Sequence, residues 1–227
     1  MKFHTFCTKN LPEKILEDHR KVCKHIGIDV QYHIEDEYHD YNEVYTAHGN
    51  FMTSVLQKEK IACFLDIDCL PFDKQVLENI YSWAKHNQSF VGNAQNISHT
   101  SMRNHVYAAA SCLIISQEAW KNLGSPSLSW FVQDNIQIDT AQILTLRADQ
   151  IGMPYRLMYP QGWDEGEGFK LSGYGQYGTG TKYPGTWHYF RISNFKNNIP
   201  HLWNQRVHDI INNKEIISNY SSVFYGT

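Results

Sequence analysis

The chain begins with a short apolar run, an amphipathic segment and a second short run, which together predict a β-α-β unit. Residues 2–8 are largely apolar and predict a strand. Pro12 then opens a segment of helical periodicity over 13–26, and Gly27 is the kind of residue that ends a helix. Residues 28–34 alternate between apolar and polar side chains, as a strand does. This order of elements is typical of the α/β class.

The rest of the chain continues the alternation of apolar runs and amphipathic segments. We expect strands over 61–71, 89–92, 107–116 and 155–159, and ordered structure again at 186–190. We expect helices over 42–58, 74–86, 117–123, 139–151 and 200–212. Residues 161–185 hold eight glycines and predict a long loop. Because no internal repeat or domain boundary is visible, the 227 residues predict one large domain.

The strand over 61–71 carries the strongest chemical signal. Five apolar residues, 61–65, run directly into Asp66 and Asp68, and Pro71 closes the segment. A continuous apolar run predicts a strand buried in a parallel sheet, and ligands bind at the carboxyl ends of such strands. Hard cations such as Mg²⁺ and Mn²⁺ prefer carboxylate oxygens, so this D-x-D pair predicts a cation site. The alternative is two solvated or capping aspartates.

Composition narrows the class of protein further. The net charge is −3 and no dense basic run is present, which argues against nucleic acid as a partner. The five cysteines form no C-x-x-C pair, and we expect them to be reduced core residues of a cytoplasmic protein. The first residues lack the apolar stretch of a signal peptide, and no run approaches the roughly 18 apolar residues of a bilayer span. We therefore expect no transmembrane segment.

Several features together resemble one enzyme family. The β-α-β start is followed by the D-x-D pair, by the small-residue stretch 109–115 with Trp120 after it, by Asp139 at a helix start, and by His188 after the glycine-rich segment. This order is similar to that of nucleotide-sugar glycosyltransferases of the GT-A type, loosely those like glycogenin, and it covers roughly residues 1–190. Two features depart from the glycogenin-like pattern: the small-residue stretch lacks an asparagine, and G-x-x-K-P-W does not follow the histidine.

The resemblance implies a fold and a reaction. The fold would be a single GT-A (Rossmann-like) domain with a mixed, mostly parallel central sheet flanked by helices. Residues 1–115 would bind the nucleotide sugar and residues 116–227 the acceptor. The reaction would be metal-dependent transfer of a sugar from a UDP- or GDP-linked donor to a glycan or glycoconjugate. Mn²⁺, or Mg²⁺, would be held by Asp66, Asp68 and His188.

The resemblance also assigns roles to residues, each with an alternative. Asp139 is the first candidate for a catalytic carboxylate and Asp134 the second, because Trp130-x-x-Gln133-Asp134 echoes a W-x-x-E-D pattern of inverting members. The candidates for contact with the nucleotide are Thr5, Cys7, Thr8, Tyr45, His48, Asn50, Asp66, Ile67 and Asp68. Asp139 could instead be a plain N-cap that forms a capping box with Gln142. His188 could be an aromatic-flanked histidine in the core or in a surface turn, and the polar residues near 45–50 could be a helix surface.

The glycine-rich segment 161–185 completes the picture. We expect it to be mobile without ligand and to close over the donor, because ordering many glycines is costly unless a ligand offsets the cost. Trp163 and Trp187 would stack on a sugar or pack in the core, and Asp164 and Glu165 would help to form the acceptor side.

Two other functions use similar residues. Phosphatases of the haloacid-dehalogenase type also end a strand with D-x-D, but they carry a threonine where this chain has Leu70. The third reading is a non-catalytic module that binds sugar nucleotides or glycans, since a fold does not determine a function.

Overall fold

The β-α-β start forms as its pattern predicts. The computed structural model describes residues 1–38, 40–96, 105–133, 135–164, 168–171, 175–189, 192 and 199–214. Strands β1 (Lys2–Thr8) and β2 (Asp29–Glu35) pair in parallel, and α1 (Glu13–Ile26) connects them. Helix α1 ends at Gly27, whose φ of +75° places it in the left-handed region while its N–H bonds to the carbonyls of Cys23 and Lys24.

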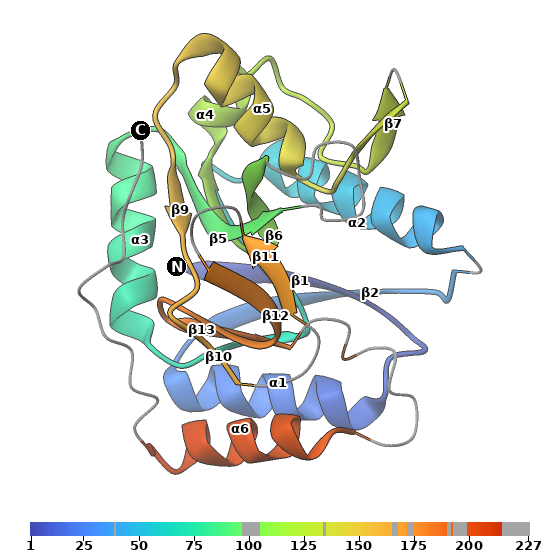
Figure 1. The fold of residues 1–227 in the computed structure, drawn as a ribbon, viewed down its shortest axis with the longest axis vertical. Coiled ribbons are helices and arrows are strands. Elements are labelled where there is room, and N and C mark those ends of the chain that lie inside the picture. The colour runs from blue at the N-terminus through green and yellow to red at the C-terminus, as the bar shows by residue number, and fades with distance from the viewer. Residues whose placement is uncertain are drawn as a thin grey trace.

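A six-stranded mixed sheet forms the centre of the molecule (Figure 1). Its strand order is β2-β1-β3-β6-β5-β9. The other four strands are β3 (Ile61–Leu65), β5 (Phe90–Asn96), β6 (Val106–Ser116) and β9 (Arg156–Met158). The pairs β1–β2, β1–β3 and β5–β9 are parallel, whereas β6 runs antiparallel to both of its neighbours. The expected mixed, mostly parallel sheet is therefore confirmed.

Helices cover both faces of this sheet, which explains the unbroken apolar run of β3. Ala62 and Phe64 pack with α2 (Tyr41–Leu56), α4 (Gln117–Asn122) and α5 (Gln142–Ile151). Cys63 and Leu65 point to the other face, where they pack with α3 (Lys74–His86). Because successive side chains of a strand alternate between faces, a strand that is covered on both faces has no polar positions.

A second, smaller sheet contradicts the prediction of a long loop over residues 161–185. Strands β10 (Gly162–Trp163), β11 (Gly168–Leu171) and β12 (Gly175–Tyr183) lie in that segment, and β12 also pairs with β13 (Thr186–Tyr189). Strand β13 in turn pairs with β4 (Cys69–Pro71). Glycine disfavours a strand only weakly, and pairing with neighbouring strands overrides that preference.

The C-terminal helix anchors this second sheet. Helix α6 (His201–Ile211) lies beside α1 at the lower edge of Figure 1. Trp203 of α6, Ile15 of α1, Leu70 of β4 and Trp187 of β13 share one buried cluster. The indole N–H of Trp203 donates to Asp18 at 3.0 Å, which ties α6 to α1.

The region before α5 forms a hairpin that the pattern did not predict. Strands β7 (Phe131–Gln133) and β8 (Ile136–Ile138) pair antiparallel, apart from the main sheet. Helix α5 begins at Gln142, after Ala141 in the left-handed region with φ +65°. Half of the expected capping box forms, because the side chain of Gln142 accepts a hydrogen bond from the Asp139 N–H at 2.9 Å. The Asp139 carboxylate does not cap α5, whose N-cap residue is Ala141 without a side-chain cap hydrogen bond.

Two expectations about the whole chain can be compared with the described residues. All five cysteines are buried free thiols, as their spacing predicts. In the described part of the chain, no helix combines the length and apolar character that a bilayer span requires.

Candidate active site

The D-x-D pair occupies a tight turn between the two sheets. Strand β3 of the large sheet ends at Leu65, and β4 of the small sheet begins at Cys69. The N–H of Asp66 donates to the Ser111 carbonyl of β6, and the Cys69 N–H donates to the Asp66 carbonyl, both at 3.0 Å. Asp66 and Asp68 therefore stand at the carboxyl end of β3, where open α/β sheets bind ligands.

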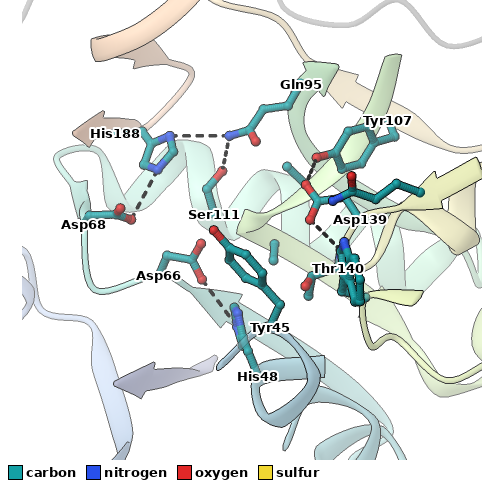
Figure 2. A pocket seen from close by; sticks show the side chains of 14 residues that line it. Tyr45, His48, Asp66, Asp68, Gln95, Tyr107, Ser111, Asp139, Thr140 and His188 are labelled. Carbon is teal, nitrogen blue, oxygen red and sulfur yellow. Dashed lines mark hydrogen bonds and ion pairs between the residues drawn. The ribbon is translucent and has the colours of Figure 1, made fainter. Parts of the chain in front are cut away.

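Strand pairing brings His188 to this turn. In the β13–β4 ladder, His188 lies opposite Cys69, and the Tyr189 N–H donates to the Asp68 carbonyl at 2.8 Å. The Nε2 atom of His188 lies 3.2 Å from Asp68 Oδ1 (Figure 2). Burial lowers the pKa of His188, but the nearby carboxylates of Asp68 and Asp66 outweigh burial, so the net pKa is raised.

The Asp66 carboxylate faces the cleft from the other side of the turn. Burial and the neighbouring Asp68 carboxylate raise the pKa of Asp66 to about 7. His48 of α2 has its Nε2 atom 3.5 Å from Asp66 Oδ1, and its ring stacks on Phe6 at 5.2 Å. Burial lowers the pKa of His48 to about 4, so this ring is neutral at pH 7 and adds no positive charge.

The opposite wall carries the third carboxylate, Asp139. Its Oδ2 atom accepts a hydrogen bond from the Tyr107 hydroxyl at 2.5 Å, and its Oδ1 accepts from the Thr140 N–H at 2.8 Å. Trp130 lines the same wall. The Trp130 Nε1 and Thr140 Oγ1 atoms are buried without a hydrogen-bond partner in the described structure. Buried polar atoms are nearly always paired, so these two atoms are suited to bind a ligand.

These residues enclose one cleft with a volume of about 240 Å³ (Figure 2). They come from α2, the D-x-D turn, β5, β6, the β7–β8 region and β13. The lining residues are Tyr45, His48, Asp66, Asp68, Gln95, Tyr107, Ala109, Ala110, Ser111, Trp130, Gln137, Asp139, Thr140 and His188. The small residues Ala109, Ala110 and Ser111 of β6 line this cleft, and the close approach of a ligand to that strand stays a prediction.

Six of the predicted site residues share this cleft, and others lie elsewhere. Tyr45, His48, Asp66, Asp68, Asp139 and His188 line it. The Thr5 hydroxyl instead donates to the Leu65 carbonyl at 2.7 Å, so it supports the end of β3 from behind. Ile67 packs against the cluster that contains Trp187 and Trp203.

The remaining predicted nucleotide contacts also have partners outside the cleft. Cys7 is buried, which raises the pKa of its thiol to about 11, and the Thr8 hydroxyl donates to Asn10. Asn50 accepts a hydrogen bond from the Ser129 hydroxyl at 2.8 Å. Asp134 and Glu165 lie outside the described residues.

Trp187 and Asp164 hold the second sheet together and do not line the cleft. Trp187 is fully buried, and its indole N–H donates to Asp164 at 2.8 Å. Arg206 and Lys182 bind the same carboxylate at 2.7 Å and 3.0 Å. Trp187 is therefore a core residue and cannot stack on a sugar. Trp163 is 40% exposed and is not part of the cleft lining.

Sequence reasoning missed Gln95, Tyr107, Trp130, Gln137 and Thr140 as lining residues. Gln95 had a usable signal, because a polar side chain near the end of a buried apolar strand needs a partner. Tyr107 had none, since an aromatic residue in an apolar strand is normally a core residue.

The residues present fit a divalent cation chemically. Two carboxylates and an imidazole line one cleft, and Asp68 Oδ1 is buried beside His188. This donor set suits Mn²⁺ or Mg²⁺. Among the described residues, however, no three histidine, cysteine or acidic side chains are close enough together to form a ready-made metal cluster. Binding a cation would thus require small side-chain adjustments.

The comparisons with known proteins identify the fold. No protein-family model and no curated protein matches this sequence. The structure is similar to that of the galactosyltransferase LgtC in complex with donor and acceptor sugar analogs. The TM-score is 0.50 at 9% sequence identity, over 96% of this chain and 98% of LgtC.

A second similar structure is the catalytic domain of Drosophila beta1,4-galactosyltransferase 7 in complex with xylobiose. That match has a TM-score of 0.46 and 11% identity, over 96% of this chain and 82% of the other. The mixed sheet flanked by helices and the match over nearly all of LgtC lead to one conclusion. This chain has the fold of the GT-A glycosyltransferases.

Proposed function

We propose that this protein is a metal-dependent glycosyltransferase that moves a sugar from a nucleoside-diphosphate sugar to a glycan or glycoconjugate. The observation that carries the proposal is the cleft itself. It places the D-x-D carboxylates and His188 on one side and Asp139 on the other. The fold shared with LgtC supports the proposal, because LgtC holds donor and acceptor sugar analogs. A fold alone does not determine an activity, so the side chains of the cleft decide it.

Asp68 and His188 would hold the cation, with Asp66 as a further ligand or as a contact through water. When bound, the cation supplies Lewis-acid stabilisation of the charge that develops on the diphosphate leaving group. Mn²⁺ is preferred over Mg²⁺ because an imidazole joins the carboxylates. The raised pKa of Asp66 supports this assignment, because burial and the neighbouring Asp68 carboxylate disfavour its charged form and a bound cation would offset both.

Asp139 would act on the sugar from the opposite wall. Its two hydrogen bonds, from Tyr107 and Thr140, orient the carboxylate and stabilise its charged form. A carboxylate held in this way can stabilise positive charge on the sugar or accept a proton from an acceptor hydroxyl. Both roles agree with the geometry, and stereochemical analysis of the product would separate them.

The donor and acceptor halves would meet at this cleft. The D-x-D turn belongs to residues 1–115, and Trp130 and Asp139 belong to residues 116–227. His188 crosses this division, because strand pairing carries it to the donor side. The unpartnered Trp130 Nε1 and Thr140 Oγ1 would bind hydroxyls on the sugar side of the cleft.

The test is release of nucleoside diphosphate from a panel of UDP- and GDP-sugars with MnCl₂, with and without glycan acceptors. We expect release with Mn²⁺ and its loss in Asp68→Asn. Asp29→Asn is a matched control, because Asp29 is exposed at the opposite end of the sheet. A phosphatase would act on phosphate monoesters instead, and a binding module would release nothing. Either result would overturn the proposal.

A further inference from the structure

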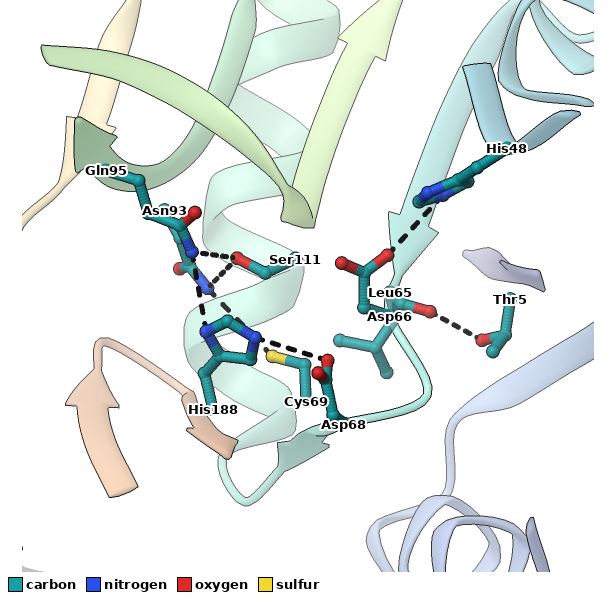
Figure 3. A network of polar contacts seen from close by, with 10 residues as sticks. All are labelled: Thr5, His48, Leu65, Asp66, Asp68, Cys69, Asn93, Gln95, Ser111 and His188. Atoms are coloured by element: carbon teal, nitrogen blue, oxygen red, sulfur yellow. Dashed lines mark hydrogen bonds and ion pairs between the residues drawn. The ribbon is translucent and has the colours of Figure 1, made fainter. Parts of the chain in front are cut away.

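A buried group of polar side chains lies behind His188, on the side away from Asp68 (Figure 3). Gln95 and Asn93 of β5 and Ser111 of β6 form it, and each of them is less than one-tenth exposed. The Nε2 atom of Gln95 lies 3.4 Å from His188 Nδ1 and 3.2 Å from Ser111 Oγ. Asn93 donates to the same hydroxyl at 3.2 Å. Polar groups buried at this depth cost stability unless they are hydrogen-bonded, as these three side chains are.

This group also connects the two cation-binding elements. The Ser111 carbonyl accepts the N–H of Asp66, while the Ser111 side chain contacts the Gln95 amide. His188, which Gln95 contacts, faces Asp68. One short path of contacts therefore runs from the D-x-D turn through Ser111 and Gln95 to His188.

We propose that Gln95 is a positioning residue that determines which ring nitrogen of His188 carries the proton, and thereby whether Nε2 is available to a cation. This inference rests on the cation site of the proposed function. With the Gln95 amide nitrogen toward Nδ1 and the ring neutral, the Gln95 NH₂ group donates to Nδ1, so the proton sits on Nε2, which lies 3.2 Å from Asp68 Oδ1.

Cation binding would reverse this arrangement. Nε2 would have to offer its lone pair to the cation, so the neutral ring would carry its proton on Nδ1, where it needs an acceptor. Rotation of the Gln95 amide by half a turn presents its carbonyl oxygen to Nδ1. The Ser111 hydroxyl can then donate to the same oxygen while it still accepts from Asn93. The Nδ1–H and the Ser111 hydroxyl then share the Gln95 carbonyl oxygen as acceptor, so the group is suited to both states of the ring.

Three variants separate positioning from simple space filling. Gln95→Glu offers only acceptor atoms to Nδ1, and Gln95→Met offers none at similar size. Gln31→Met is the control, because Gln31 is exposed on β2. Circular dichroism establishes that each variant is folded.

The first measurement is ¹⁵N NMR of the His188 ring without cation, at a pH above the raised pKa of His188, where the ring is neutral. We expect Nδ1 to be unprotonated in the wild type and in Gln31→Met, and to carry a proton in Gln95→Glu. The same state of Nδ1 in wild type and Gln95→Glu would overturn the inference. This measurement needs no metal and no activity, so it stands even if the proposed function fails.

The second measurement is Mn²⁺ binding, from the electron paramagnetic resonance signal of free Mn²⁺ with and without UDP. Loss of a side chain that orients a metal-binding histidine typically weakens affinity by about 10- to 100-fold. We expect such a loss in Gln95→Met, and affinity within about threefold of wild type in Gln95→Glu and Gln31→Met. Wild-type affinity in Gln95→Met would overturn the inference, whereas no Mn²⁺ binding in the wild type would overturn the proposed cation site.

Discussion

Substitution of Gly49 by alanine tests whether the close packing of α2 shapes the cleft. A Cβ atom at position 49 would lie 2.2 Å from the Ser129 Cα and 2.6 Å from the Leu128 carbonyl carbon. These are backbone atoms, so no side-chain rotation relieves the contact. The two segments must separate by about 1 Å or more to reach an ordinary carbon–carbon distance.

Hydrogen bonds oppose that separation. The Leu128 N–H donates to the Thr53 hydroxyl, which itself donates to the Gly49 carbonyl. The Ser129 hydroxyl donates to the side chain of Asn50, the residue that follows Gly49 in the helix. The clash therefore falls between two segments, α2 and residues 128–129, that hydrogen bonds already hold together.

Two effects of opposite sign determine the stability of Gly49→Ala. Alanine in a helix interior is favoured over glycine by about 1 kcal/mol. Overpacking a tight contact costs about 1–3 kcal/mol, and a backbone clash lies at the upper end of that range. We expect a net loss of about 2 kcal/mol in the free energy of unfolding.

The cleft should be affected as well. Ser129 directly precedes Trp130, and α2 carries His48, so both walls move if the contact opens. A displacement of about 1 Å can lower a catalytic rate by up to about 100-fold. We expect nucleoside-diphosphate release to fall about 10- to 100-fold at temperatures where the variant is folded.

Urea denaturation of wild type and Gly49→Ala measures the first effect, and the release assay measures the second. Gly162→Ala is the control, because its added Cβ would meet only the Lys182 side chain at 3.7 Å. If Gly49→Ala were as stable as the wild type or more so, the packing argument would be refuted.

Three further predictions concern the carboxylates of the cleft. Asp68→Ala should abolish Mn²⁺-dependent release of nucleoside diphosphate and the Mn²⁺-induced rise in thermal stability, while its circular dichroism spectrum stays unchanged. A variant that is unfolded or fully active would indicate that Asp68 has a structural role instead. The raised pKa of Asp66, about 7, means that the folded protein holds a proton that the unfolded chain has already released above a pKa of about 3.9. The contribution of Asp66 to stability therefore decreases as pH rises from 4 to 7, so the free energy of unfolding of Asp66→Asn should increase relative to wild type across that range. Urea titrations with EDTA at each pH measure this difference, and a difference that does not change with pH would count against the prediction. Tyr107→Phe removes the 2.5 Å hydrogen bond to Asp139 and should lower kcat about tenfold with little change in donor KM, which steady-state kinetics will show.

Local sequence was sufficient for most of the elements and for part of the site. Helix α1 could be located because Pro12 and Gly27 delimit an amphipathic period, and the apolar run 61–65 indicated a strand that is covered on both faces. The chemistry of Asp66 and Asp68 was visible for the same reason, since charge at the end of a buried strand demands a partner. These signals are local because helix periodicity, helix start and stop signals and strand burial each depend on a few neighbouring residues.

Only the tertiary structure decided how distant segments meet. The glycine-rich segment contains strands β10, β11 and β12 because β12 pairs with β10, β11 and β13, and no local pattern specifies those partners. The pairing of β13 with β4 then places His188 beside Asp68, more than a hundred residues away in sequence.

The contacts of Gln95 with His188 and of Tyr107 with Asp139 have the same origin. Each contact joins side chains from segments far apart in sequence, and the local sequence of neither segment specifies the contact. Strand order and register are properties of the whole sheet, so the walls of the cleft follow from long-range pairing and packing. The D-x-D turn, by contrast, could be predicted from eleven consecutive residues, 61–71, because its signals are local.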